Sequence, residues 1–362
     1  MITRDILIHL NLIPVGSSTI LGYMQKIQPG LLTSLGLAEN NFLSDKKLDE
    51  IKGALESSRV KFIEELQLIK KHQIKITTIL DEDYPESLKE IYLPPLVLYW
   101  KGASLNFKKS ISVVGARQAD FLAKEAIDFL VPSLVAAGYA IVSGGAIGVD
   151  TMAHTKALSC QGHTVAILGS GLLSLYPLSN IFLFKEIEKT GAVVSGFSLK
   201  VAPLPQNFPI RNRIIAGFSR GTLVVQAAKK SGARITAEFA LNQGRDVFAV
   251  PGPFNHSLSE GCNKLIQDGA KLVFTPEDIL VEYGETIESK ISARSSRVLK
   301  NSDIYKPTKP TDPILALCLN PKSLEDIQTE LNITMPELQC KLFELQCDGK
   351  IEQNFAGLWV RV

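Results

Sequence analysis

The sequence predicts an α/β protein built around a Rossmann-like, mostly parallel sheet. Three observations predict it. Residues 111–154 twice run through a strand, a glycine turn and a helix, the same alternation continues to about residue 274, and the apolar runs are short and β-branched. Strands that alternate with helices of this length form right-handed βαβ units. We therefore expect about seven parallel strands in one sheet domain.

The first two units set two glycine turns side by side. The strand at 111–114 ends at Gly115-Ala116-Arg117, and a helix follows from about 119 to 137. The strand at 139–142 ends at Ser143-Gly144-Gly145, again before a helix. In a parallel sheet both turns lie beyond the carboxyl ends of the strands, where ligands bind. Glycine lets the backbone approach a ligand, and the free N–H groups of the next helix favour phosphate.

Neither turn matches a standard nucleotide fingerprint. Gly115 does not begin the G-x-G-x-x-G pattern of dinucleotide sites, and no Gly-Lys-Ser or Gly-Lys-Thr follows a strand. Arg117 instead supplies a fixed positive charge with a planar fork that suits phosphate. One turn glycine more often serves the turn alone. Two turns at one sheet edge, one with an arginine, favour a phosphorylated ligand, and we expect no cofactor.

The alternation of strands and helices continues along the chain. The next strands are expected at 163–168, 192–195, 222–225, 246–250 and 272–274, and the next helices at 179–189, 207–218, 233–242 and 262–268. A turn at Gly169-Ser170-Gly171 separates the first of these strands from its helix.

The F-P-I-R-N-R helix start is the third informative place. Arg211 and Arg213 put cations where the helix dipole opposes them unless an anion is bound. Beside Phe208 they predict an anion site with an aromatic platform, which suits single-stranded nucleic acid. The alternative is that either arginine pairs with an acidic side chain such as Asp150 or Glu238.

The segments around the sheet differ from it in character. Residues 1–78 are predicted to form a helical domain, SAM-like or similar to a helix-hairpin-helix. The turn at 12–18 lacks the second glycine that a helix-hairpin-helix needs, so we favour a packing role. The Rossmann-like domain covers 79–283, and a serine- and lysine-rich linker covers 284–310.

Residues 311–362 are predicted to form a winged helix, with three helices and a hairpin around Ala356-Gly357. Ser323 and Asp326 stand at the capping-box offset before the second helix. The third helix carries one lysine against several acids, so we favour protein contact over DNA reading for this domain.

Composition excludes several classes of protein. No apolar run reaches the roughly 18 residues of a membrane span, and the first residues lack the pattern of a signal peptide. We therefore expect a cytoplasmic protein with no membrane contact. The five cysteines are scattered without a C-x-x-C pair, so we expect neither a metal site nor disulfides. The net charge of +2 argues for nucleic acid only where cations cluster locally.

Several long motifs occur in the order typical of one family. They are VVGARQA at 113–119, SGGAIGVDTMAH at 143–154, GSG at 169–171, YPLSN at 176–180, FPIRNRIIAGFS at 208–219, TLVVQAAKKSGARITAEFALNQGRDVFAVPG at 222–252 and GCNKLIQDGA at 261–270. With these motifs the chain resembles the DNA-processing protein A family, DprA or Smf. It departs at Ser195-Gly196-Phe197 and at Gln226, where many relatives carry an acidic residue.

The resemblance implies a protein without catalytic activity that binds and protects incoming single-stranded DNA, forms a homodimer and loads RecA during natural transformation. In the family, the first-turn arginine, the double-glycine loop and the F-P-x-R-N-R helix start line one positive pocket. In this chain the corresponding DNA-binding residues are Arg117, Ser143, Gly144, Gly145, Phe208, Arg211, Asn212 and Arg213.

Two other hypotheses stay open. One is a nucleotide hydrolase of the phosphoribohydrolase, lysine-decarboxylase-like type, which has a related sheet. That type needs P-G-G-x-G-T and a downstream glutamate, whereas this chain has Pro251-Gly252-Pro253. Asp150 and His154, one helical turn apart, are better explained by structural hydrogen bonding. The other hypothesis is a DNA-binding regulator that acts through the winged helix.

Overall fold

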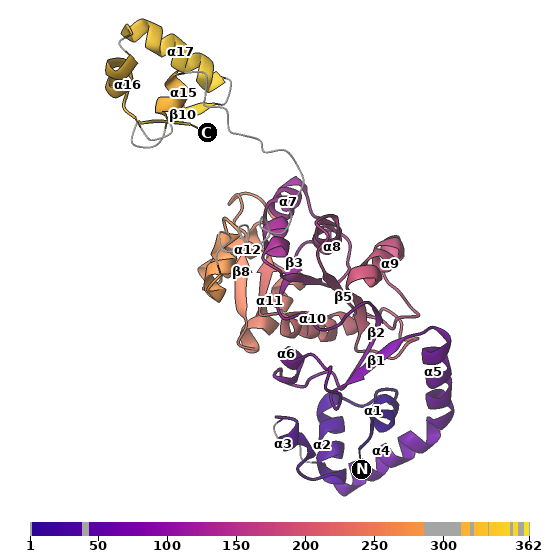
Figure 1. Cartoon of the computed structure of the whole chain (residues 1–362). Coiled ribbons are helices and arrows are strands. Elements are labelled where there is room, and N and C mark those ends of the chain that lie inside the picture. Colours follow the sequence, from indigo (N-terminus) through magenta and orange to yellow (C-terminus); the bar gives the residue numbers. More distant parts are fainter. Residues whose placement is uncertain are drawn as a thin grey trace. The chain divides into compact units, whose positions relative to one another are not determined.

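The computed structural model describes residues 2–37, 43–285, 313–318, 322–331, 333–347, 350–353 and 358–361. The chain divides into two compact units, Met1–Ala293 and Arg294–Val362. Figure 1 shows the elements of each unit. Of the linker predicted at 284–310, residues 286–310 lie outside the described residues.

The described strands of the first unit form one nine-stranded sheet in the order β1-β2-β6-β5-β4-β3-β7-β8-β9. Their bounds are β1 Lys75–Thr78, β2 Val97–Gly102, β3 Ser110–Val114, β4 Ala140–Ser143, β5 Thr164–Leu168, β6 Ala192–Ser195, β7 Gly221–Val224, β8 Asp246–Ala249 and β9 Lys271–Leu272. Strands β3 to β9 pair in parallel, and β1 and β2 add an antiparallel pair beside β6. The predicted α/β fold with a largely parallel sheet is confirmed.

Helices cover both faces of this sheet (Figure 1). They are α7 Phe121–Ala136, α8 Val149–Ser159, α9 Ile181–Thr190, α10 Asn207–Phe218, α11 Gly232–Asn242, α12 Glu260–Gln267 and α13 Glu277–Leu280, with short 3₁₀ turns at Leu178–Asn180 and Val281–Tyr283. Strands β3 to β7 are buried along their whole length. Such burial is expected of parallel strands that are covered on both faces.

The direction in which the chain crosses the sheet reverses at β3. From β3 the chain steps outward through α7, α8 and α9 to β6, and α10 then brings it back to β7 on the other side of β3. The loops that follow β3 and β7 therefore diverge, and a crevice opens beyond the carboxyl ends of these strands. Ser112 Oγ donates to Ile215 O at 2.7 Å and holds α10 against β3.

Within the described residues, five helices precede the sheet. They are α1 Arg4–Leu10, α2 Ser17–Ile27, α3 Leu31–Ser34, α4 Asp45–Ser57 and α5 Arg59–Lys71, and the short α6 Glu86–Lys89 lies between β1 and β2. The sheet begins at Lys75, inside the range 1–78 predicted to be helical, because β-branched Ile76, Thr77 and Thr78 pair with β2. The SAM-like or helix-hairpin-helix-like character of the helices stays a prediction.

Glu65 joins these helices to the sheet domain. Its side chain is 5% exposed, and its Oε1 accepts a hydrogen bond from Leu199 N at 2.8 Å, in the loop after β6. Burial raises the pKa of the Glu65 carboxyl above its ordinary value of 4.5, and the Leu199 N–H and Lys200 oppose this rise.

We expect the Glu65 carboxyl to make the protein less stable as pH rises. The folded state holds the Glu65 proton more tightly than the unfolded state, so stability falls between the unfolded value of 4.5 and the raised folded pKa. Glu65→Gln keeps an acceptor oxygen and should remove this loss. In urea unfolding, its midpoint should rise relative to wild type as pH increases above 4.5. A difference from wild type that does not change with pH would contradict this role, and Glu64→Gln at the exposed neighbouring position is the control.

The second unit has a small core of its own. Its described elements are α15 Pro313–Leu317, α16 Leu324–Leu331, α17 Met335–Cys347, β10 Ile351–Gln353 and β11 Trp359–Arg361, and the two strands pair antiparallel. Ser323 N donates to Asp326 Oδ2, and Asp326 N donates to Ser323 Oγ, so the predicted capping box is confirmed. The predicted turn at Ala356-Gly357 lies outside the described residues. The winged-helix assignment stays a prediction.

The described part of the chain has neither a membrane-spanning helix nor a cluster of metal-binding side chains. It contains no helix that is both long and apolar enough to cross a membrane. Within the same residues, no three His, Cys, Asp or Glu side chains gather where a metal ion could bind.

Candidate functional site

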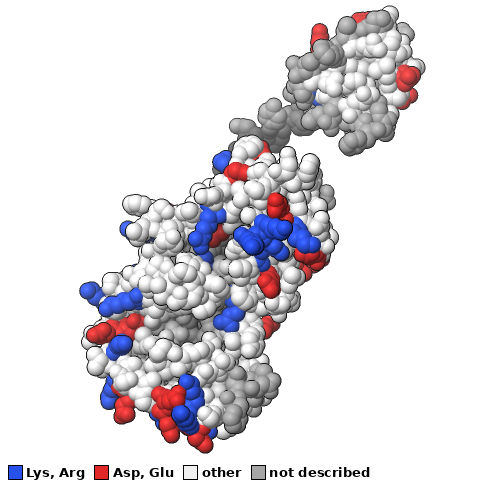
Figure 2. All heavy atoms as spheres, turned by 180° about the vertical axis from the view of Figure 1, so that it is seen from behind, with Lys and Arg blue, Asp and Glu red and all other residues white. Residues whose placement is uncertain are grey.

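Charged side chains are unevenly placed on the surface of the first unit. Figure 2 shows one face, on which Lys and Arg side chains stand between wide uncharged areas and in several places lie beside acidic side chains. With a net charge of +2, the chain has no general excess of cations. Any anion site must therefore depend on local grouping.

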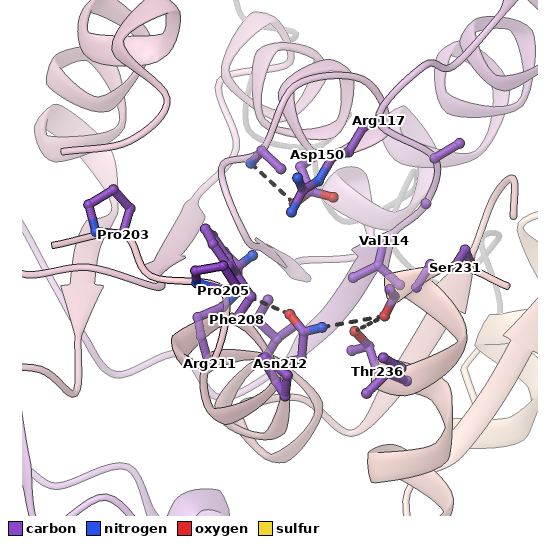
Figure 3. A pocket seen from close by; sticks show the side chains of 18 of the residues that line it. Val114, Arg117, Asp150, Pro203, Pro205, Phe208, Arg211, Asn212, Ser231 and Thr236 are labelled. Carbon is purple, nitrogen blue, oxygen red and sulfur yellow. Dashed lines mark hydrogen bonds between the residues drawn. The ribbon is translucent and has the colours of Figure 1, made fainter.

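The crevice beyond β3 and β7 contains a cavity of about 710 Å³. Its lining comes from the loop after β3, the region around the start of α8, and the N-terminal turns of α10 and α11. Figure 3 labels side chains of three groups that face it. They are Arg117 and Asp150, then Phe208, Arg211 and Asn212 of α10, and finally Ser231, the N-cap of α11, with Thr236 inside that helix. The cavity therefore lies where the strand order reverses, the usual ligand position in open α/β sheets.

Arg117 and Phe208 combine a cation with an aromatic ring at this cavity. Arg117 is exposed in the turn after β3, and its Cζ lies 5.4 Å from the centroid of the Phe208 ring. This separation is within the range of a cation–π contact. The Tyr176 ring stands edge-on to Phe208, with 6.1 Å between the centroids. A Cβ at Gly169 would lie 2.9 Å from Phe208 Cδ1, so the predicted glycine turn leaves room for the Phe208 ring.

Arg211 lines the same cavity, but its side chain is buried and hydrogen-bonds to the protein itself. Its side chain is 4% exposed. Nη1 donates to the carbonyl oxygens of Gly144 and Ile167, and Nε donates to Asn212 Oδ1. Burial lowers the pKa of the Arg211 guanidinium to about 10, a shift that Asp150 opposes. Burial also raises the pKa of Asp150, which Arg211 opposes. Of the two acids named in the alternative hypothesis, Asp150 is therefore the one whose charge acts on Arg211.

The double-glycine turn encloses this buried pair. Asp150 Oδ2 accepts hydrogen bonds from Gly144 N at 3.1 Å and Ala146 N at 3.2 Å. A Cβ at Gly144 would lie 2.7 Å from Asp150 Oδ2 and would overlap Arg211 Nη1. Gly145 has a φ of +65°, which favours glycine. The turn thus fits around Asp150 and Arg211.

Arg213 and Asn212 have different surroundings. Arg213 Nη1 donates to Tyr92 O at 2.7 Å, and burial lowers the pKa of Arg213 while Tyr84 and Tyr92 oppose this. Asn212 Nδ2 donates to Gly232 O at 3.3 Å and so connects α10 to α11. The predicted site residues that line the cavity are Arg117, Phe208, Arg211 and Asn212, and those that do not are Ser143, Gly144, Gly145 and Arg213.

Comparison with known proteins assigns the family. Residues 75–284, more than half of the chain, match the family model described as DNA recombination-mediator protein A. The chain belongs to this family. The DprA-family match includes the whole nine-stranded sheet and every residue that lines the cavity, and the predicted resemblance is confirmed.

Three DprA proteins or structures illustrate the similarity. The DNA processing protein DprA of Streptococcus pneumoniae is 43% identical over 208 residues, which cover 57% of this chain and 73% of that protein. The X-ray structure of DprA from Streptococcus pneumoniae matches with a TM-score of 0.66 at 35% identity, over 78% of this chain and 98% of that chain. A structure of DprA from Helicobacter pylori, described for its single-stranded DNA binding mode, matches with a TM-score of 0.53 at 27% identity, over 61% of this chain and 97% of that chain.

Sequence reasoning missed part of the DprA-type cavity. Ser231, Gly232 and Thr236 line it from the start of α11, and Tyr176 lines it from the loop before α9. The available signal was a later strand, turn and helix unit, in which Ser231 Oγ caps α11 by accepting from Arg234 N. The sequence does not show that β7 pairs with β3, so this turn could not be placed beside Arg117.

Asp150 and His154 both make structural hydrogen bonds in this DprA-family chain. His154 is buried, and its Nδ1 lies 2.7 Å from Thr164 Oγ1. Burial, together with the Arg211 charge, lowers the pKa of His154 to about 3, so its imidazole is neutral at neutral pH. His154 hydrogen-bonds to Thr164, whereas Asp150 hydrogen-bonds to backbone amides. The two side chains therefore stabilise different parts of the fold.

Proposed function

We propose that this chain binds single-stranded DNA in the cavity between β3, α10 and α11. The observation that carries the proposal is the exposed Arg117 guanidinium 5.4 Å from the Phe208 ring centroid. Single-strand sites combine cations for the backbone with aromatic rings on which bases stack. The DprA of Helicobacter pylori, whose structure is described for its single-stranded DNA binding mode, supports the same ligand.

The predicted site residues have different parts in this proposal. Arg117 contacts a phosphate and Phe208 stacks on a base. Arg211 and Asn212 form the base of the site and hold its shape through their bonds to Gly144, Ile167 and Gly232. Contact of DNA with Ser143, Gly144, Gly145 or Arg213 stays a prediction from the sequence.

We propose a binding protein rather than an enzyme. The single carboxylate among the lining residues, Asp150, is bonded to two backbone amides, and no histidine or cysteine is among these residues. A phosphoribohydrolase would need a carboxylate directed at its substrate.

We further propose that the chain acts in the cytoplasm as a homodimer, with a C-terminal winged helix that contacts protein.

The proposed cellular role is to protect incoming single strands and load RecA onto them during natural transformation. RecA-catalysed ATP hydrolysis on single strands coated with a single-strand-binding protein tests this role. The wild type should shorten the lag before hydrolysis, and Arg117→Ala should not. A wild type that binds the strands but leaves the lag unchanged would reject the mediator role and leave DNA binding in place.

A further inference from the structure

A second cavity adjoins the first. It has a volume of about 640 Å³, and both cavities are lined by Ser231, Gly232 and Ile235. The shared residues belong to the first turn of α11 and its cap. A chain-like ligand could therefore pass from the Arg117 cavity to the second one around the start of α11.

The second cavity is lined by three cations. Lys229 and Lys230 are exposed in the loop between β7 and α11, and Arg234 follows in the first turn of α11. Within the described part of the chain, no ion pair involves any of them. Arg234 Nη1 donates to Lys229 O at 2.6 Å, which fixes the loop that carries the two lysines.

The remaining lining residues complete a site for nucleotides. Ile235 and Leu241 are 40% and 57% exposed and offer apolar surface. Two carboxylates, Glu238 and Asp268, also line the cavity, and Asp268 forms an ion pair with Lys264 at 2.9 Å. With three cations against two carboxylates, the lining keeps a net positive charge. Exposed lysines usually contact solvent alone, but this pair lies directly beside a candidate phosphate site.

We propose that the second cavity takes the nucleotides that follow those bound at Arg117, with Lys229 and Lys230 contacting their phosphates. This inference rests on the proposed function. It predicts that the binding site is longer than the first cavity, and that the strand bends around the start of α11.

Oligonucleotide length separates the two cavities. We would compare labelled oligothymidylates of about five and about fifteen nucleotides, lengths within the range of single-strand sites. Lys229→Ala/Lys230→Ala should bind the short strand like wild type and the long strand about tenfold more weakly. Its salt slope on the long strand should be shallower by about 1.4, since each lost phosphate contact removes about 0.7.

A matched control is Lys70→Ala/Lys71→Ala, which removes an adjacent pair of exposed lysines from the end of α5. It should bind both strands like wild type. If the Lys229/Lys230 variant matches wild type on the long strand, or loses the short strand equally, the inference is wrong. The proposed function stands in both cases provided that Arg117→Ala weakens the short strand. If wild type binds neither strand, the proposed function fails and the inference fails with it.

Discussion

Replacing Arg211 by alanine is expected to lower the free energy of unfolding by about 2–6 kcal/mol, because two buried carbonyl oxygens lose their donor at about 1–3 kcal/mol each. The change leaves the buried Asp150 carboxylate without its neighbouring cation. It also removes the donor to the carbonyl oxygens of Gly144 and Ile167. DNA binding should be lost as a consequence of unfolding.

Chemical denaturation at neutral pH measures this effect. Arg213→Ala is the control on the same helix, because it loses one hydrogen bond to Tyr92 O at a half-buried position, which should cost about 1 kcal/mol. The double variant Asp150→Asn/Arg211→Met removes both charges and should recover part of the loss. An Arg211→Ala protein with wild-type stability and impaired DNA binding would contradict the structural role and make Arg211 a direct DNA ligand.

Phe208→Ala should weaken single-strand binding by about tenfold to a hundredfold. Stacking of one base on an aromatic ring contributes about 1–3 kcal/mol, and about 1.4 kcal/mol corresponds to a factor of ten. Because no charge changes, the dependence of affinity on salt should stay as in wild type. The fold should persist, since the Phe208 ring is partly exposed at the cavity.

Phe208→Tyr tests the reason for this loss. It keeps an aromatic face of similar size and should bind within about threefold of wild type, much better than alanine. Fluorescence anisotropy at constant salt gives both affinities. If alanine and tyrosine at position 208 bind equally well, the ring is not a stacking platform.

Much of the fold follows from local sequence. The helix expected at 207–218 has the bounds Asn207–Phe218 in the structure, because its apolar positions and Pro209 mark a helix start clearly. The strands after it were also placed closely, since short β-branched runs between glycine turns fit a buried parallel sheet. The antiparallel strand β1 lies across the boundary predicted at residue 78, because four residues carry too weak a pattern to set where the helical segment ends.

The site was harder to predict than the fold. Arg211 and Arg213 are two residues apart on α10, and side chains at this spacing do not share a helix face. One of them therefore had to turn away from any single pocket, and Arg213 bonds to Tyr92. The burial of Arg211 beside Asp150 depends on how α10 packs against β4 and β5, which no local pattern contains. The role of the α11 start likewise depends on strand order.

The most direct test of the central claim is fluorescence anisotropy of labelled single-stranded and duplex oligonucleotides with wild type and Arg117→Ala, across a salt series. Wild type should prefer the single strand, with affinity that falls steeply as salt increases. Arg117→Ala should bind at least about tenfold more weakly, with a salt slope shallower by about 0.7 and an unchanged unfolding midpoint. A variant that binds like wild type, or a wild type that binds neither oligonucleotide, would show that this cavity is not a DNA site.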